Sequence, residues 1–420
     1  MRLMHFADCH FGVELYGRLD PATGLNTRLI DFRNSLNAII DAAIEAGVHI
    51  ALFAGDAYKS RDPSQTHQRE FALCIRRLTE RGIPVALLTG NHDLPGVKGR
   101  AHTLDIFKTL GADRVFVFSQ PDVQKIETPG GTIQIAALPT LMPSMVAARE
   151  PTSTGEDGSN GSGSKMEATS FRQRLESQYL AYLNTLREEI DRAYPTVLLG
   201  HFWVDRAMLS DWQAGYFSSN EPTVSLSNLA VREFDYVALG HIHHFQNLNP
   251  NNNPPVVYAG SPDRIDFGES DDDKGFVLVD IERGHADFRH IKNPLARQFQ
   301  EIVVDATGDD PMTTILAAIE KVDIRDAIVR LAYRVDQERQ SLIRDREIRD
   351  ALKEAHTIAG IQRQVRSKIS RRSDGLTEAR STIEALEAYI ATLERLKPLK
   401  KELVELAMPL IEHVERDSEM

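Results

Sequence analysis

The sequence has little cysteine, no long apolar run and no excess of basic charge. Its 420 residues include 2 cysteines, too few for a disulfide framework, so a reducing, cytoplasmic compartment is expected. No apolar run approaches the roughly 20 residues that a membrane-spanning helix needs. The N-terminus also lacks the charged segment and apolar core of a signal peptide. We therefore predict a cytoplasmic protein that does not enter the membrane.

The net charge of −12 argues against a protein that coats nucleic acid through charge alone. It does not exclude a nuclease, because divalent metals and local basic patches can hold phosphate groups on an acidic protein. At this length, two or three domains are expected. Composition therefore leaves the question of nucleic-acid binding open.

What the sequence does contain is a repeated pattern of apolar strand, small residue and ligand-type side chains. In residues 85–93, VALLTGNHD, the apolar run ends at Gly90 and is followed by Asn91, His92 and Asp93. Ligands of open α/β sheets lie where the strands end at their carboxyl edge. Strand ends that meet at one edge would assemble a metal site from distant parts of the chain. The pattern recurs at four further places: Met4–His10, Ile50–Asp56, Thr196–His201 and Tyr236–His243.

Helical segments separate the strands and indicate a layered α/β sandwich. Residues 150–166 are rich in glycine and serine, which predicts a flexible surface loop. Strands of a second half-sheet are expected at 115–118 and 132–137. Apolar spacing, together with proline, serine and glycine at the boundaries, predicts helices at 32–46, 64–81 and 171–193.

Beyond Pro294 the pattern changes to strand, helix, strand, helix, strand, which is enough for a small second domain. From Leu376, apolar residues at steps of three and four predict a long amphipathic helix, with breaks or kinks at Pro398 and Pro409. We predict a metal-site domain at 1–293, an α+β cap domain at 294–370 and a helical tail at 371–420. The apolar face of the tail has no remaining partner domain in the chain, and it comprises Ile383, Leu386, Ile390, Leu393 and Leu396.

The strand-end side chains offer the mixed oxygen and nitrogen ligands that suit divalent metals at a phosphate ester. They suffice for two metal sites if one carboxylate bridges the sites, and Asp56 fits that role because it follows a tight glycine turn. Two metals about 3.5–4 Å apart can position a phosphate and stabilise both the attacking and the leaving oxygen. The predicted ligands are Asp8, His10, Asp56, Asn91, His201, His241 and His243.

His92 remains after the ligands are assigned. An imidazole beside the metals can protonate a leaving oxygen or stabilise the charged transition state, so we predict that His92 is the general acid. Asp93 is predicted to accept the other ring proton of His92 and to fix its tautomer.

The ordered set Asp-x-His, Gly-Asp, Gly-Asn-His-Asp, Gly-His and Gly-His-x-His resembles the signature of the calcineurin-like metallophosphoesterases over residues 1–291. Within that superfamily the chain is similar to the SbcD-type nuclease subunits of bacterial SbcC–SbcD complexes. Three features carry this closer resemblance: the opening Asp8–Gly12, the segment Ala259–Pro262 followed by Asp266–Glu269, and the cap and helical tail beyond the catalytic domain.

The resemblance implies a four-layer α/β/β/α sandwich with a small α+β cap domain and a C-terminal helical tail. It implies a DNA exonuclease and endonuclease of double-strand-break repair that uses two divalent metal ions, usually Mn²⁺. A homodimer is expected, and residues 376–414 would dock on the coiled coil of an SbcC-type ATPase. By resemblance, Asp8, His10, Asp56 and His243 would bind one metal, and Asp56, Asn91, His201 and His241 the other.

Two basic residues after Asp56 are predicted DNA contacts. Lys59 occupies a position where some relatives carry a second histidine, and it could contact phosphate as a point charge, although a solvated loop lysine is the simpler interpretation. Arg61 matches a basic position in the DNA-facing loop of the family.

The main alternative is a small-molecule or cyclic-nucleotide phosphodiesterase with the same dimetal core. A non-catalytic scaffold that acts through its helical tail is a further alternative. The cap and tail favour the nuclease, since a small-substrate enzyme needs no amphipathic tail without an internal partner. The complete ligand set disfavours the scaffold, because a decayed site loses ligands first.

Overall fold

The computed structural model describes the chain except for residues 96–99, 142–162, 210–220, 367–381, 393–395 and 419–420. No helix within the described ranges is both long and apolar enough to cross a membrane. The chain divides into two compact units. The first comprises Met1–Ile302, Ala318–Leu331 and Arg349–Ile361, and the second comprises Val303–Ala317, Ala332–Ile348 and Gln362–Met420.

Two six-stranded sheets form the centre of the first unit. The first sheet has the order β14-β13-β1-β2-β3-β4, in which β1 to β4 run parallel. Its strands are β1 (Arg2–Phe6), β2 (Ile50–Phe53), β3 (Val85–Leu88), β4 (Val115–Phe118), β13 (Gly275–Glu282) and β14 (His285–Lys292).

The second sheet has the order β11-β12-β10-β7-β6-β5, in which β12, β10, β7 and β6 run parallel. Its strands are β5 (Asp122–Thr128), β6 (Gly131–Leu138), β7 (Thr196–His201), β10 (Tyr236–Gly240), β11 (Gln246–Asn247) and β12 (Val256–Tyr258). A separate two-stranded sheet pairs β8 (Trp203–Val204) with β9 (Thr223–Val224).

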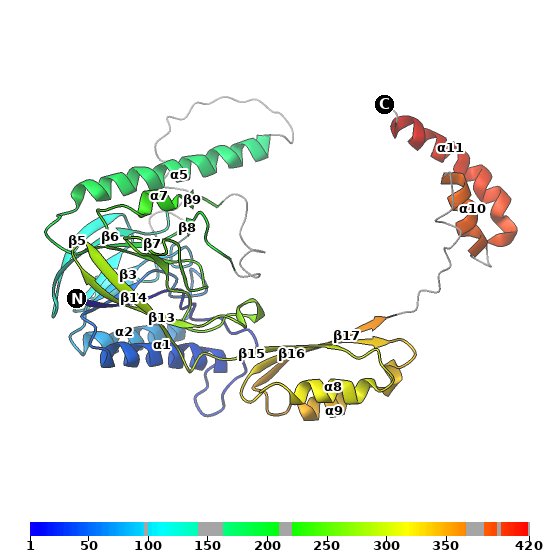
Figure 1. Ribbon diagram of the computed structural model, residues 1–420, viewed down its shortest axis with the longest axis horizontal. Coiled ribbons are helices and arrows are strands. Elements are labelled where there is room, and N and C mark those ends of the chain that lie inside the picture. Colours follow the sequence, from blue (N-terminus) through cyan, green and yellow to red (C-terminus); the bar gives the residue numbers. More distant parts are fainter. Residues whose placement is uncertain (96–99, 142–162, 210–220, 367–381, 393–395, 419–420) are drawn as a thin grey trace. The chain divides into compact units, whose positions relative to one another are not determined.

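Helices cover the outer faces of the two sheets (Figure 1). The first sheet packs against α1 (Thr27–Glu45), α2 (Gln65–Thr79) and α3 (Asp105–Thr109), and the second packs against α5 (Gly163–Glu189) and α7 (Leu226–Leu229). A third apolar core lies between the sheets, so alternate residues of one strand enter different cores. In β1, Leu3 faces the other sheet and Met4 faces the helices. This burial on both faces explains the continuous apolar strands and confirms the predicted four-layer sandwich.

The helix boundaries partly follow the predictions. Ser64 is the N-cap of α2 and its hydroxyl accepts a hydrogen bond from the His67 amide. α1 begins at Thr27, before the predicted residue 32, because Asn26 caps it. α5 begins at Gly163, inside the segment predicted as a loop, whereas 150–162 lie outside the described residues.

Two expectations for the strands were wrong or incomplete. Val115–Phe118 forms β4, but it pairs with β3 in the first sheet and not with the second half-sheet. The strands β5 and β14 were not predicted, because both lie at sheet edges and alternate exposed polar residues with few apolar ones.

The strands beyond Pro294 form a three-stranded sheet in the order β15-β16-β17. Together with two helices they occur in the predicted order: β15 (Phe299–Asp305), α8 (Pro311–Glu320), β16 (Ile328–Asp336), α9 (Asp345–Ala351) and β17 (Thr357–Arg366). The tail contains α10 (Thr382–Thr392), which contacts α11 (Lys400–Ser418). Pro398 lies in the short η3 segment (Lys397–Leu399) between them, whereas Pro409 lies within a continuous α11.

Candidate metal centre

The predicted ligands lie at or just beyond the carboxyl ends of the parallel strands β1, β2, β3, β7 and β10. Four of them have a left-handed backbone conformation, which residues with a Cβ rarely adopt. The φ angle is 53° at Asp8, 44° at His10, 61° at Asp56 and 98° at His241. Such conformations persist only where the surrounding structure enforces them, and they cluster at functional sites. The strain therefore marks this sheet edge as a site.

Close packing brings the strand ends together, both within the first sheet and between the two sheets. A Cβ on Gly90 would lie 2.0 Å from Oδ1 of Asp56, and a Cβ on Gly240 would lie 2.1 Å from the carbonyl oxygen of Ala54. Neither position has room for a side chain. The small residues of the repeated sequence pattern thus allow the close approach on which the site depends.

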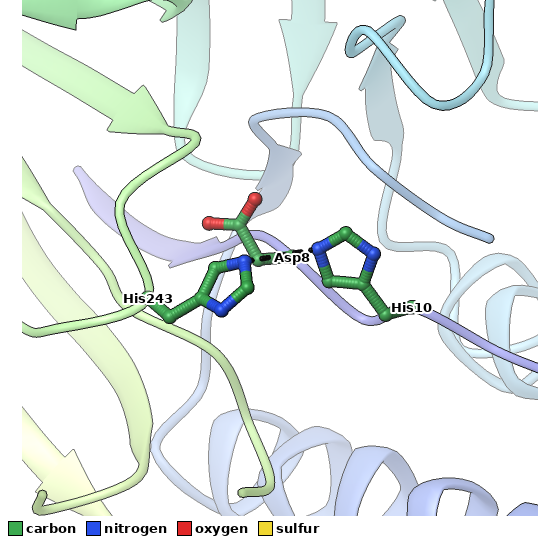
Figure 2. Close-up of side chains that lie close together, drawn as sticks. All are labelled: Asp8, His10 and His243. Carbon is green, nitrogen blue, oxygen red and sulfur yellow. Dashed lines mark hydrogen bonds between the residues drawn. The ribbon is translucent and has the colours of Figure 1, made fainter. Parts of the chain in front are cut away.

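The first cluster consists of Asp8, His10 and His243, and one ligand atom from each lies within 4.8 Å of the others. The Nε2 atoms of His10 and His243 are 3.0 Å apart (Figure 2). A carboxylate oxygen with two imidazole nitrogens is a donor set that suits a divalent transition metal.

The second cluster is centred on His201. Its Nε2 lies 3.4 Å from Oδ2 of Asp56 and 3.0 Å from Oδ1 of Asn91, and the same Asn91 oxygen lies 3.2 Å from Nδ1 of His241. Oδ2 of Asp56 also lies 3.7 Å from Nε2 of His10 in the first cluster. Asp56 thus stands between the clusters, as expected of a bridging ligand. The structure brings all seven predicted ligands together.

Burial and charge set the protonation of these groups. Burial favours the neutral carboxyl of Asp56, but His201 and His92 outweigh burial and hold its pKa well below the usual range. Burial likewise lowers the pKa of His201, yet Asp56 raises it to about 9. Burial raises the pKa of Asp8 and holds the pKa of His10 well below its usual range, which leaves His10 neutral with a free lone pair. Metal binding requires deprotonated ligands, so a bound divalent ion would displace the proton that this environment favours on His201.

Three of the histidines have a second ring nitrogen that contacts a carbonyl or carboxylate oxygen. Nδ1 of His201 donates to the carbonyl oxygen of Ala54 (2.7 Å), and Nδ1 of His243 lies 2.7 Å from Oε1 of Glu269. Nε2 of His241 lies 2.7 Å from Oε1 of Glu221. Partners of this kind fix the tautomer and orientation of metal ligands. Glu221 was not singled out in the sequence, and Glu269 appeared there only as part of a resembling segment.

The predicted contact between His92 and Asp93 is wrong. Nδ1 of His92 donates to the carbonyl oxygen of Lys59 at 2.7 Å. The Asp93 carboxylate turns inward and accepts hydrogen bonds from the amides of Asp56 (2.9 Å) and Gly90 (3.0 Å). Burial, with the nearby charge of Asp56, raises the pKa of Asp93 to about 7. Asp93 therefore orders the loops that carry Asp56 and Asn91.

A surface cleft adjoins the second cluster. Its volume is about 420 Å³, and it contains both basic residues that were predicted to contact DNA. The side chain of His92 is 43% exposed, and its Nε2 lies 3.9 Å from Oδ2 of Asp56, so this ring stands between the cleft and the clusters. The cleft is lined by Lys59, Ser60, Arg61, Asp62, Asn91 and His92.

The chain was also compared with known proteins. It is 24% identical over 329 residues to the DNA double-strand break repair protein Mre11 of Thermoplasma acidophilum, an alignment that covers 77% of this chain and 73% of the relative. It is 24% identical over 287 residues to a subunit of the nuclease SbcCD of Escherichia coli, covering 68% of this chain and 66% of the relative. A dimetal phosphatase from Danio rerio matches at 10% identity with a TM-score of 0.40, covering 70% of this chain and 99% of that one.

The family model for the calcineurin-like phosphoesterases matches residues 1–245, which is more than half of the chain. The matched residues include the ends of β1, β2, β3, β7 and β10, where all seven predicted ligands lie. The chain belongs to the calcineurin-like phosphoesterase family.

Proposed function

We propose that this chain is the metal-dependent nuclease subunit of an SbcCD-like complex for DNA double-strand-break repair, and that it hydrolyses DNA phosphodiester bonds. The observation that carries the proposal is the complete double cluster of ligands beside an open cleft with two basic residues. The names of the curated relatives support DNA over a small phosphodiester or cyclic nucleotide as the substrate. A cytoplasmic location remains the prediction from the sequence.

The donor set fits two divalent metals, for which we propose Mn²⁺. When bound, the metals would polarise the phosphate and lower the pKa of the attacking water. Asp56 lies between the two groups of ligands and would hold both. We assign Asp8, His10, Asp56 and His243 to the first metal, and Asp56, Asn91, His201 and His241 to the second.

His92 would protonate the leaving oxygen. Because a carbonyl oxygen can only accept, the hydrogen bond to Lys59 holds one proton on Nδ1, and the proton given to the leaving oxygen is the second one, on Nε2 of the imidazolium form. The half-exposed ring can reach a bound phosphodiester from the cleft side. Asp93 acts as a positioning residue through the backbone amides that it binds.

DNA would enter through the cleft beside His92. Lys59 and Arg61 line it, and their charges would contact phosphates that flank the scissile bond. The net charge of −12 makes such a local basic track necessary, since the surface as a whole repels DNA.

We further propose that two copies associate through α2 and α3. The two helices lie next to each other, with the rings of Phe71 and Phe107 at 6.4 Å between centroids. Each helix also exposes apolar side chains: Leu73 on α2, and Ile106 with the following Leu110 at α3. Exposed apolar residues on adjacent helices favour a partner surface.

The partner ATPase would dock on the tail, residues 371–420. Ile390 is 3% exposed, so this member of the predicted apolar face is buried in the structure, and Leu393 lies outside the described residues. On α11, Leu406 and Leu410 are 71% and 69% exposed. Apolar side chains four residues apart on one helix suit a coiled-coil partner. The cap, 294–370, would then shape the DNA path.

Replacing Leu406 and Leu410 together with serine is expected to abolish binding of an SbcC-type ATPase and to leave phosphodiester hydrolysis unchanged. Both side chains are exposed, so the double variant removes apolar surface that a partner could cover and leaves the core of the chain unchanged. Co-purification of the two subunits measures binding, and Lys401→Ser on the same helix is the matched control. Retention of the ATPase by the double variant would move the docking site away from α11.

The proposed function is tested by Mn²⁺-dependent hydrolysis by the purified chain, with a DNA duplex end, bis-p-nitrophenyl phosphate and a cyclic nucleotide compared side by side. We expect degradation of DNA only when metal is present. Turnover of the two small diesters without any attack on DNA would support the dimetal centre but rule out the nuclease function.

A further inference from the structure

A buried glutamate and a buried lysine contact His243, one of the predicted metal ligands. Glu269 ends the short η1 helix (Phe267–Glu269), and Lys274 directly precedes β13. Nδ1 of His243 lies 2.7 Å from Oε1 of Glu269, and Nζ of Lys274 lies 2.8 Å from Oε2 of the same carboxylate. Both the Glu269 and Lys274 side chains are 0% exposed. A fully buried ion pair contributes little net stability, which suggests that its role lies elsewhere.

Lys274 acts on both the ring and the backbone of His243. It pairs with the carboxylate beside the ring, and it also donates a hydrogen bond to the backbone carbonyl oxygen of His243 at 3.1 Å. Its further hydrogen bonds go to Oγ of Ser261 (3.0 Å) and Oδ2 of Asp272 (3.1 Å). One ammonium group therefore fixes both the backbone of His243 and the group that its ring contacts.

These contacts determine the tautomer of His243. The amide of Ile265 donates to Oε2 of Glu269 at 3.0 Å, so this oxygen already serves two donors and Oε1 is left for the ring. Because an ionised carboxylate only accepts, the ring proton of His243 must lie on Nδ1. In the neutral ring Nε2 then carries the lone pair, and this atom lies 3.0 Å from Nε2 of His10. This is the tautomer that binding a metal through Nε2 requires.

We propose that Glu269 and Lys274 are positioning residues of the first metal site, and that they hold His243 in the orientation and tautomer that bind the metal. The inference rests on the proposed dimetal function and adds two residues to it. Neither residue reaches the reacting atoms, so both act only through His243.

The test is the variant Glu269→Gln. The side-chain oxygen of the introduced glutamine would face the two donors, Lys274 and the Ile265 amide, and its NH₂ group would face Nδ1 of His243. The ring would then accept at Nδ1 and carry its proton on Nε2, which blocks the metal. We expect one of two Mn²⁺ sites to weaken by about 10- to 100-fold. Titration of the metal-free full chain with Mn²⁺, by calorimetry and by elemental analysis after gel filtration, measures this without reference to activity.

Two further variants make the result decisive. Glu269→Gln/Lys274→Met leaves neither charge at these two buried positions, and it decides the matter if the single variant does not fold. We expect the double variant to fold and to show the same weakening of one Mn²⁺ site. Asp287→Asn alters the exposed His285–Asp287 pair in the same way and should retain both metals. Folded variants that bind two Mn²⁺ as tightly as the unaltered chain would overturn this inference alone. If the unaltered chain binds no Mn²⁺, the dimetal function itself fails.

Discussion

Replacing Asp56 with alanine is expected to remove both metals and to abolish phosphodiester hydrolysis. Its Oδ2 lies 3.4 Å from Nε2 of His201 and 3.7 Å from Nε2 of His10, so both sites lose a ligand and their shared negative charge. Metal ions supply several kcal/mol of transition-state stabilisation, and a loss of about 4 kcal/mol lowers the rate about 10³-fold. Elemental analysis of the purified variant and DNA hydrolysis in Mn²⁺ measure the two effects together.

The control for Asp56→Ala is a carboxylate far from any cluster. The Asp113 side chain is 90% exposed, so Asp113→Ala should retain both metals and full activity. A thermal melt separates loss of metal from loss of fold, because Asp56 also accepts a hydrogen bond from the His92 amide at 2.9 Å. Tight retention of two metals by Asp56→Ala would rule out the bridge.

The meeting of the seven candidate ligands could be predicted because each lies at or just beyond the end of an apolar strand. Parallel strands end at one edge, so local sequence is enough to place Asp8, Asp56 and Asn91 together in the first sheet. His201 and His241 follow the same rule in the second sheet. The positions of these residues depend only on strand direction, which the alternation of strands and helices already indicates.

The groups behind the ligands could not be predicted in this way. Glu221 and Glu269 contact His241 and His243 from positions that no apolar run of the sequence directly precedes, so periodicity says nothing about their side chains. The neighbours His92 and Asp93 illustrate a related limit. Adjacent residues in a turn can point in different directions, and here one ring faces the cleft while the carboxylate faces three buried amides.

At the edge strands, the pattern of apolar and polar residues does not predict the structure. β14 alternates buried Ala286 with exposed His285 and Asp287, a pattern that does not distinguish a solvated strand from a loop. β4 has four apolar residues and was recognised, but its sheet was not, because pairing is set by contacts distant in sequence.

Replacing His92 with alanine is expected to reduce DNA cleavage about 10²- to 10⁴-fold while both metals remain bound. All seven predicted ligands are unchanged in this variant, and the side chain of His92 is 43% exposed. Metal content and the rate of DNA hydrolysis are measured on the same preparation. His285→Ala, at an exposed histidine, is the matched control.

The leaving group separates proton donation from other roles of His92. The sugar oxygen of DNA is a poor leaving group and needs a proton, whereas p-nitrophenolate is stable without one. His92→Ala should therefore slow DNA cleavage far more than it slows hydrolysis of bis-p-nitrophenyl phosphate. Equal losses on both substrates would assign His92 to charge stabilisation in the transition state. Loss of a metal would instead show that His92 is itself a ligand. Its position in one cluster with His10 and Asp56 also allows that role. The ratio of the two rates, read beside the metal content, distinguishes the three roles in one experiment.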